Sequence, residues 1–303
     1  MKDNLLEGHS GCKLFLIKAK DSDHIEGIRK LSKDKEYNRR LKAQAIKQSD
    51  FESNIFFSPN VYGEGEIEDV YFFDMQYIRG DTLSNSIVTL SSGEIERISD
   101  NLASFIEENL STIAVENQTD KNNLVLKKID NIEKSLNSNG KKNLKKTFKY
   151  LDDFNWDKIE SSSCHGDLTF ENILISNEKM YLIDFLDTFI ETWVSDISKI
   201  LQDLIVGWSF RKKIIGDEIT EIEKIKMNLF KDVFCRKINN RISKTDLWEQ
   251  VHVYLLLDLL RIIPYTDDEK IYEYIERSIL KLTYDVEEGK FYEYINNSMR
   301  WPL

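Results

Sequence analysis

The sequence predicts an α+β protein with a strand-rich first part and a larger, mostly helical remainder. Three observations carry this prediction. Short apolar runs bounded by turn residues fill the chain up to residue 78, and long runs with apolar residues at helical spacing dominate from residue 79 on. One hairpin-like pattern interrupts those helices near residues 172–185. We therefore expect two domains, residues 1–78 and residues 79–303.

The first domain is expected to contain a small sheet and one helix. Residues 12–19 and 24–32 are short apolar runs joined by the turn sequence "KDSD", which predicts two strands. From Lys35 on, "EYNRRLKAQAIKQ" consists of good helix formers without Gly or Pro and predicts a helix. Residues 61–78 predict two more strands around an acidic turn, because the second half is rich in β-branched and aromatic side chains. The sequence "RGDTL" then ends the pattern.

The second domain is expected to be built from long helices. The stretch "SSGEIERISDNLASFIEENL" combines a Ser cap, an early Glu and apolar residues at a helical period. The Lys-rich residues 122–150 predict solvated helix with a break at "NSNG", and further helical patterns cover residues 219–242, 245–263 and 268–287. The exception is a β-hairpin whose two apolar runs, "NILI" and "YLIDF", flank the turn "SNEK".

Composition narrows the class of protein. The 303 residues carry 42 Lys+Arg against 53 Asp+Glu, a net charge of −11, which argues against a nucleic-acid partner because such binding depends on neutralising phosphates. No run approaches the roughly 18 to 20 apolar residues that cross a bilayer, and the N-terminus lacks the layout of a secretory signal. Three widely spaced cysteines predict free thiols in a reducing compartment. We expect a cytoplasmic protein without a membrane partner.

The hairpin brings together residue types suited to phosphoryl transfer. Asn172 stands just before its first strand and Asp184 at the end of its second, so a short hairpin places the two side by side. A carboxylate and an amide oxygen are hard donors that suit Mg²⁺. Asp167, on the loop that enters the hairpin, would then lie near a metal-bound phosphate and accept a proton from an attacking hydroxyl. These groups supply a base and a metal site, the minimum for phosphoryl transfer.

The motifs "HGDLTFEN" and "LIDF" resemble the catalytic and metal-binding segments of the aminoglycoside phosphotransferase and choline kinase family. The resemblance implies a protein-kinase-like two-lobed fold, with a small antiparallel-sheet N-lobe and a larger, mostly helical C-lobe. It also implies that Asp167 is the catalytic base, that Asn172 and Asp184 bind Mg²⁺, and that His165 braces the loop. The stretch "SDISKILQDL" matches the next helix of the family, where Asp196 would cap the helix and steady the catalytic loop.

By the same resemblance the first domain should bind the nucleotide. The stretch "EGHSGCKLFLIK" stands where a nucleotide-binding loop would join two strands, and the backbone N–H groups of Ser10 and Gly11 could approach phosphate oxygens. The full Gly-x-Gly-x-x-Gly spacing is absent, so an ordinary turn is an equal reading. The backbone of Met75, Gln76 and Tyr77 would face the adenine ring.

Lys30, on the strand predicted at residues 24–32, would pair with the phosphates by the same resemblance. The acidic partner expected for it on the next helix stays open. Glu36 comes early on that helix, whereas Gln44 stands at a better depth but is not an acid.

The acceptor site is sought among polar and aromatic residues after the hairpin. Asp187, Glu191 and Asp203 could form an acidic pocket for a cationic substrate, and Asp187 and Glu191 could equally be exposed loop acids. Trp193 and Trp208 could form an aromatic box for a quaternary ammonium group, or pack into the core.

A later segment, "LLRIIPYT", adds Arg261 and Tyr265, which either line the pocket or pack beneath it. Taken together, the residues and the family resemblance imply an ATP-dependent phosphotransferase, with GTP as another donor, that uses Mg²⁺ to phosphorylate a hydroxyl of a sugar, an amino alcohol or an aminoglycoside. The alternative is a non-catalytic nucleotide-binding protein of the same fold. The intact set of Asp167, Asn172 and Asp184 argues against that alternative.

Overall fold

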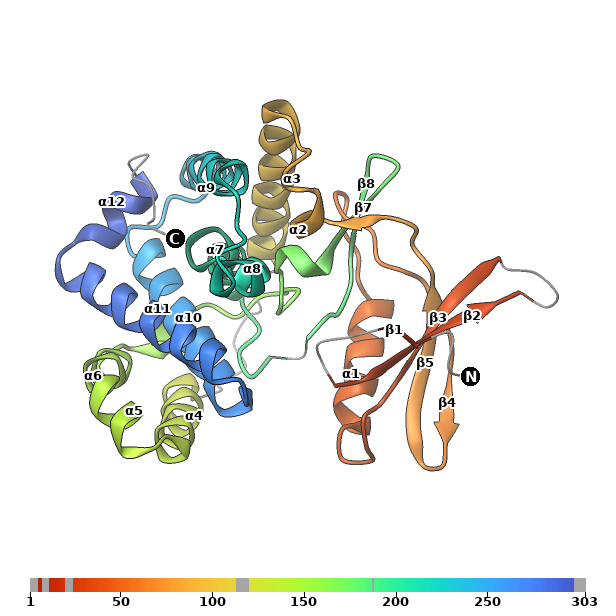
Figure 1. Cartoon of the computed structure of the whole chain (residues 1–303), viewed down its shortest axis with the longest axis horizontal. Coiled ribbons are helices and arrows are strands. Elements are labelled where there is room, and N and C mark those ends of the chain that lie inside the picture. The colour runs from red at the N-terminus through yellow and green to blue at the C-terminus, as the bar shows by residue number, and fades with distance from the viewer. Residues whose placement is uncertain (1–4, 7–10, 20–23, 113–119, 187, 297–303) are drawn as a thin grey trace. The chain divides into compact units, whose positions relative to one another are not determined.

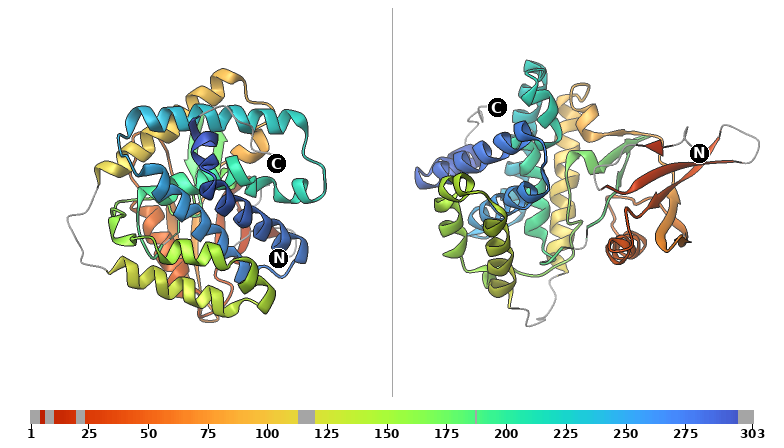
Figure 2. Two further views of the ribbon diagram at one scale, coloured as in Figure 1. Left: turned by 90° about the vertical axis from the view of Figure 1, so that its left-hand side faces the viewer. Right: turned by 60° about the horizontal axis from the view of Figure 1, so that its bottom comes forward.

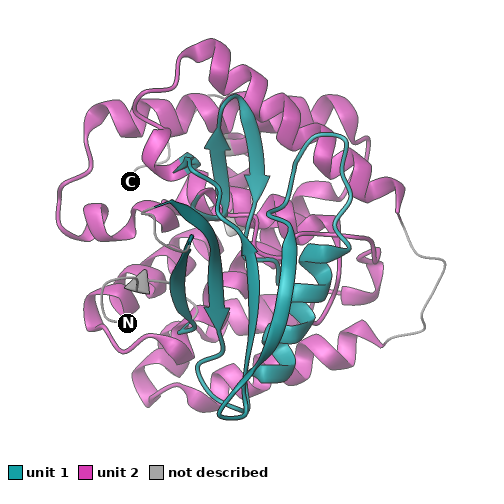
Figure 3. Cartoon of the chain, turned by 90° about the vertical axis from the view of Figure 1, so that its right-hand side faces the viewer, with its two compact units in different colours: residues 1–83, 171–188 teal, residues 84–170, 189–303 magenta. Residues whose placement is uncertain are grey.

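A computed structural model describes residues 5–6, 11–19, 24–112, 120–186 and 188–296. The chain forms two compact units (Figure 3), of which unit 1 comprises residues 1–83 and 171–188 and unit 2 residues 84–170 and 189–303. These units are defined by contacts in the folded chain. The predicted division into domains 1–78 and 79–303 stays a prediction.

Unit 1 contains an antiparallel sheet of five strands in the order β1-β2-β3-β5-β4 (Figure 1). The four strands predicted from the sequence are all present. Glu68 and Asp69, both at positive φ, form the tight two-residue turn between the last two strands. The strands are β1 (Leu5–Leu6), β2 (Lys13–Lys18), β3 (Ile25–Leu31), β4 (Val61–Ile67) and β5 (Val70–Gln76).

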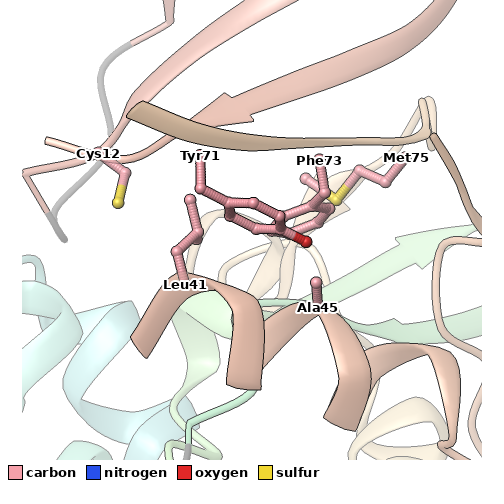
Figure 4. Close-up of a cluster of buried hydrophobic side chains, with 6 residues drawn as sticks. All are labelled: Cys12, Leu41, Ala45, Tyr71, Phe73 and Met75. Atoms are coloured by element: carbon pink, nitrogen blue, oxygen red, sulfur yellow. The ribbon is translucent and has the colours of Figure 1, made fainter. Parts of the chain in front are cut away.

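Helix α1 (Asn38–Ser49) covers one face of this sheet. Leu41 and Ala45, four residues apart, point from the helix toward Tyr71 and Phe73, which alternate with outward-facing residues along β5 (Figure 4). Cys12 and Met75 complete the cluster. The helix begins three residues later than expected, because the carboxylate of Asp34 accepts the N–H of Tyr37 and holds residues 35–37 in a turn.

The predicted hairpin forms a second, three-stranded sheet in unit 1 from β6 (Asp81–Thr82), β7 (Ile173–Ser176) and β8 (Lys179–Leu182). Asn177 and Glu178 at positive φ make its turn. The backbone of Phe57 fixes the hairpin to the rest of the unit by accepting from Leu182 at 2.8 Å and donating to Met180 at 3.0 Å. Asp184 lies two residues beyond the end of β8 rather than on the strand.

Unit 2 is helical, and one of its helix caps was predicted from the sequence. Ser91 and Glu94 form the predicted capping box of α3, and Thr220 and Glu223 form another at α9. The break predicted at "NSNG" is shifted, because Asn137 caps a new helix there. The helices are α3 (Ser92–Ser111), α4 (Lys121–Ser135), α5 (Ser138–Asn143), α6 (Lys145–Asp152), α7 (Trp193–Leu201), α8 (Arg211–Ile215), α9 (Glu221–Arg241), α10 (Leu247–Ile262), α11 (Glu269–Glu287) and α12 (Lys290–Asn296).

Two helices form the centre of unit 2. Every residue of α7 is buried, as are most residues of α10, which packs against it, and α3 lies beside α9 (Figure 2). Helix α10 is apolar along most of its length, as a helix enclosed on most sides usually is, whereas α7 also buries the polar side chains of Asp196 and Lys199. A short π-helical turn, η4 (Gln202–Val206), continues α7 and ends at Gly207, whose φ of 78° lies in the left-handed region. Among the described residues no helix is both long and apolar enough to cross a membrane.

Candidate functional site

The loop that carries Asp167 is held at its start by a buried carboxylate. Asp196, in the first turn of α7, accepts the backbone N–H of His165 at 2.8 Å and that of Gly166 at 2.9 Å. Asn109 donates to the same carboxylate at 3.3 Å. Gly166 adopts a φ of 89°, a conformation that side chains disfavour, so the glycine is needed at this turn. Asp196 does not cap α7 as predicted, because Thr192 occupies the cap and accepts from Val194.

A second buried carboxylate holds the end of the same loop. Asp203 accepts the N–H of Phe170 at 2.5 Å and that of Ser209 at 2.7 Å. This residue, considered above as part of an acidic pocket, is fully buried and bound to the backbone. His165 is also fully buried, and its Nδ1 accepts the N–H of Asp167 at 3.3 Å. The loop is therefore fixed by side chains bound to its own N–H groups.

Asp167 itself contacts a lysine that sequence reasoning did not single out. Lys199 of α7 places its Nζ 3.3 Å from Oδ1 of Asp167 and 3.7 Å from Oδ1 of Asp258 on α10. Burial alone would lower the pKa of Lys199, but the carboxylates of Asp258 and Asp167 outweigh it and raise that pKa above its usual value. An acid inside the apolar run "YLLLDLL" was the sequence signal that could have revealed this cluster.

In unit 1, Lys30 is buried and bound to Asp184. Its Nζ lies 2.8 Å from Oδ1 of Asp184 and 3.3 Å from Oε1 of Gln44. Burial opposes the charge of Lys30, yet Asp184 raises the pKa of its ammonium above the ordinary value. The acidic partner left open in the sequence is therefore Asp184. Glu36 is exposed in the turn before α1, and Gln44 occupies the helical position expected for an acid.

Asn172 and Asp184 are brought together by the hairpin. The N–H of Ile183 donates to the carbonyl of Asn172 at 3.0 Å, so the residue before Asp184 is paired with Asn172. Asp184 has a φ of 59°, an uncommon conformation for a residue other than glycine and one that often marks functional positions. A carboxylate and an amide oxygen fit Mg²⁺, which prefers a few protein oxygens with water and phosphate oxygens in the remaining positions. The described residues contain no group of three or more His, Cys, Asp or Glu arranged for a metal.

The other residues predicted to bind the nucleotide are Ser10, Gly11, Met75 and Tyr77. Ser10 lies outside the described residues. Gly11 adopts a φ of 73° directly before Cys12. Met75 pairs with Ile28 and its side chain is buried in the core, whereas Tyr77 follows the end of β5 and is half-buried.

The predicted acceptor residues fall into different environments. Asp187 lies outside the described residues. Glu191 accepts a hydrogen bond from Sγ of Cys164 at 3.0 Å. Trp193 is fully buried in unit 2, so the aromatic-box interpretation is wrong for it and the core interpretation is right. Burying the large apolar surface of this side chain stabilises the folded state, because apolar surface is removed from water.

Arg261 lies in the last turn of α10. Tyr265 is the last residue of the short helical turn that follows, residues 263–265. Nη1 of Arg261 lies 3.3 Å from Oδ1 of Asp258, and its guanidinium stands 5.0 Å from the centre of the Phe189 ring. Tyr265 is 78% exposed and therefore does not pack beneath a pocket.

Comparison with known proteins bears on the architecture. No protein-family model and no curated protein matches the chain. An aminoglycoside phosphotransferase solved with AMP-PNP and hygromycin B is 12% identical, covering 92% of this chain and 92% of that protein, with a TM-score of 0.62. A choline/ethanolamine kinase family protein from Mesorhizobium loti is 13% identical over 96% of this chain and 90% of its own, with a TM-score of 0.55. An amicoumacin kinase solved with AMP-PNP and Ca²⁺ is 11% identical over 94% and 89%, with a TM-score of 0.58.

Structural similarity at such low sequence identity is evidence for the fold only. The similar structures agree with the antiparallel sheet of unit 1 and the helices of unit 2. They confirm the α+β class predicted from the sequence. The chain has the protein-kinase-like fold found in small-molecule kinases of the aminoglycoside phosphotransferase and choline kinase type.

Proposed function

We propose that the protein transfers the γ-phosphoryl group of ATP, or of GTP, to a hydroxyl of a small molecule. The observation that carries this proposal is the pair of Lys30 and Asp184 in unit 1. A lysine from β3 and an aspartate 154 positions later meet at 2.8 Å, and that aspartate adopts a strained backbone beside Asn172. A buried cation next to hard oxygen donors is what a polyphosphate with its metal requires.

Unit 1 would bind the nucleotide. Lys30 would donate to phosphate oxygens, the backbone of Ser10 and Gly11 would approach the phosphates, and Met75 and Tyr77 would offer backbone groups to the adenine. Asn172 and Asp184 would hold Mg²⁺, which in this reaction class neutralises the charge of the phosphates.

Unit 2 would supply the base. Asp167 accepts the proton of the acceptor hydroxyl as the new bond from oxygen to the γ-phosphorus forms and the bond to the β-phosphate oxygen breaks. His165 and Asp196 keep the loop of Asp167 in place through the hydrogen bonds described above. Preorganised groups of this kind need no rearrangement during the reaction, which is where most of their benefit arises.

The acceptor is proposed to be a sugar, an amino alcohol or an aminoglycoside, with Glu191, Arg261 and Asp187 as candidate contacts. Arg261 and Glu191 carry opposite charges, so an acceptor with both an amine and an anionic or polar group would suit them. We expect the reaction to take place in the cytoplasm, because three free thiols, Cys12, Cys164 and Cys235, suit a reducing compartment.

The test is the substitution Asp167→Asn. We expect kcat to fall about 1000-fold, because a general base contributes 10² to 10⁴ in rate. The thermal shift produced by Mg-ATP should persist, since Asp167 is not proposed to bind the nucleotide. Turnover is measured as ADP release with a panel of amino alcohols, sugars and aminoglycosides.

Asp153→Asn is the control, because Asp153 is an exposed aspartate of unit 2 outside this loop, and it should behave like the wild type. Wild-type turnover by Asp167→Asn would refute the assigned base. Binding of Mg-ATP without ADP release for any acceptor would favour the non-catalytic alternative.

A further inference from the structure

Lys199 is a buried cation in the centre of unit 2. Its side chain is only 11% exposed, and its Nζ has oxygen partners in three directions. Asp167 lies at 3.3 Å, Gln202 at 3.3 Å and Asp258 at 3.7 Å. Asp167 and Gln202 lie within hydrogen-bond distance of the ammonium group, whereas Asp258, at 3.7 Å, is an ion-pair partner just beyond that distance.

Asp258 is fixed more firmly than its lysine partner. Its side chain is 2% exposed on α10, most of whose residues are buried. Oδ2 of Asp258 accepts from the hydroxyl of Ser198 at 2.7 Å, and Oδ1 lies 3.3 Å from Nη1 of Arg261. The carboxylate therefore has a set direction, and it sets the position of Lys199 in turn.

The stability of the fold does not explain this arrangement. Removing two charges from water costs several kcal/mol per ion, and buried ion pairs are often no better for stability than apolar residues of equal volume. Helix α10 is otherwise apolar along the stretch "YLLLDLL", where a leucine would pack in place of Asp258. A buried pair that contacts a candidate base is instead a candidate part of a functional site.

We propose that Lys199, anchored by Asp258, is the residue that positions the catalytic base Asp167. This inference rests on the proposed phosphotransferase function. Lys199 holds one oxygen of the Asp167 carboxylate and fixes the rotation of that side chain. The side chain of Asp167 is 28% exposed, and the contact with Lys199 restrains its rotation.

Lys199 acts on Asp167 through geometry, by holding one oxygen of its carboxylate. Phosphoryl transfer passes through a loose transition state, and its catalysis depends largely on positioning the reacting groups and on electrostatic stabilisation. A misplacement of about 1 Å at the reacting atoms can cost about 100-fold in rate. The contact with Lys199 gives the carboxylate of Asp167 a fixed orientation.

The decisive experiment is a kinetic double-mutant cycle between Lys199→Met and Asp167→Asn. Methionine keeps the length of the side chain and removes its charge. We expect Lys199→Met to lower kcat about 100-fold with KM for Mg-ATP unchanged. In the Asp167→Asn background the same change should lower kcat no further, because Lys199 acts only through Asp167. Lys199→Arg, which keeps a cation, should recover part of the loss.

Lys231→Met is the matched control. Lys231 is also a buried lysine of unit 2, with its Nζ 3.2 Å from Oδ1 of Asp232 on the same helix. The Lys231→Met variant should lose stability as Lys199→Met does, and it should keep the wild-type kcat. This comparison separates the cost of removing a buried charge from the loss of a positioned base.

The outcomes distinguish the inference from the function on which it rests. A wild-type protein without turnover for any acceptor refutes both. An active wild type whose Lys199→Met variant keeps its kcat overturns the inference alone, as do multiplicative effects of the two substitutions. If Lys199→Met does not fold, Asp258→Asn must lower kcat at unchanged KM for Mg-ATP, and a wild-type kcat in that variant overturns the inference.

Discussion

Replacing Asp196 by asparagine probes how the loop of Asp167 is held. The carboxylate accepts two backbone N–H groups, one on each oxygen, at 2.8 Å and 2.9 Å. An asparagine has one acceptor oxygen, and its NH₂ group would face the other N–H donor. One bond to a charged acceptor, worth about 1.5 to 3 kcal/mol, is lost, and a buried N–H is left unpaired at about 1 to 3 kcal/mol. These contributions overlap, so we expect a loss of about 3 kcal/mol.

The assay is urea unfolding followed by circular dichroism, with turnover measured on the same samples. Asp130→Asn is the control, because Asp130 is exposed and its ion pair with Lys134, four residues on, contributes about 0.3 to 0.5 kcal/mol. The folded Asp196→Asn protein should also lose kcat, since the loop shifts when Gly166 is released. A free energy of unfolding within about 0.5 kcal/mol of the wild type would refute the reasoning, because surface changes stay in that range.

Two further predictions concern buried groups elsewhere. Lys30→Met should abolish the thermal shift caused by Mg-ATP, since the buried cation facing Asp184 is removed, and an unchanged shift would contradict its role in binding phosphate. His252 is fully buried, and burial lowers its pKa from 6.5 to about 3. Below pH 6.5 the unfolded chain binds a proton at His252, whereas the folded chain does not bind it until the pH approaches 3. The contribution of His252 to the free energy of unfolding is therefore fully present above pH 6.5 and is lost as the pH falls toward 3. Between pH 7.5 and pH 5 the wild type should lose about 2 kcal/mol more than His252→Leu in urea unfolding, and equal losses would contradict this account.

Local patterns were sufficient for most of the elements. The capping box of Ser91 and Glu94 is written in four consecutive residues, and the hairpin turn at Asn177 and Glu178 depends on residues next to each other. Capping and tight turns are local chemistry, so a sequence window contains all of their determinants. The start of α1 was misjudged because Asp34, a turn-forming side chain, competes with the helix for the N–H of Tyr37.

Contacts between residues far apart in the chain could not be predicted from the sequence. Lys30 was expected to find an acid on the next helix, yet its carboxylate comes from Asp184, far along the chain. Trp193 could be assigned to a substrate box or to the core from its type alone, and only the burial of α7 decided between them. Long-range pairs depend on how whole elements pack, and no local pattern encodes that.

The sequence by itself determined the order of strands and helices and the residues placed on the loop and hairpin, because periodicity, caps and turns act over a few neighbouring residues. The tertiary structure alone decided which charges meet. Asp196 and Asp203 became acceptors for backbone N–H groups, and Asp258 became the anchor of Lys199. A buried charge must find a partner wherever the fold provides one, so its role is fixed by packing rather than by its neighbours in the chain.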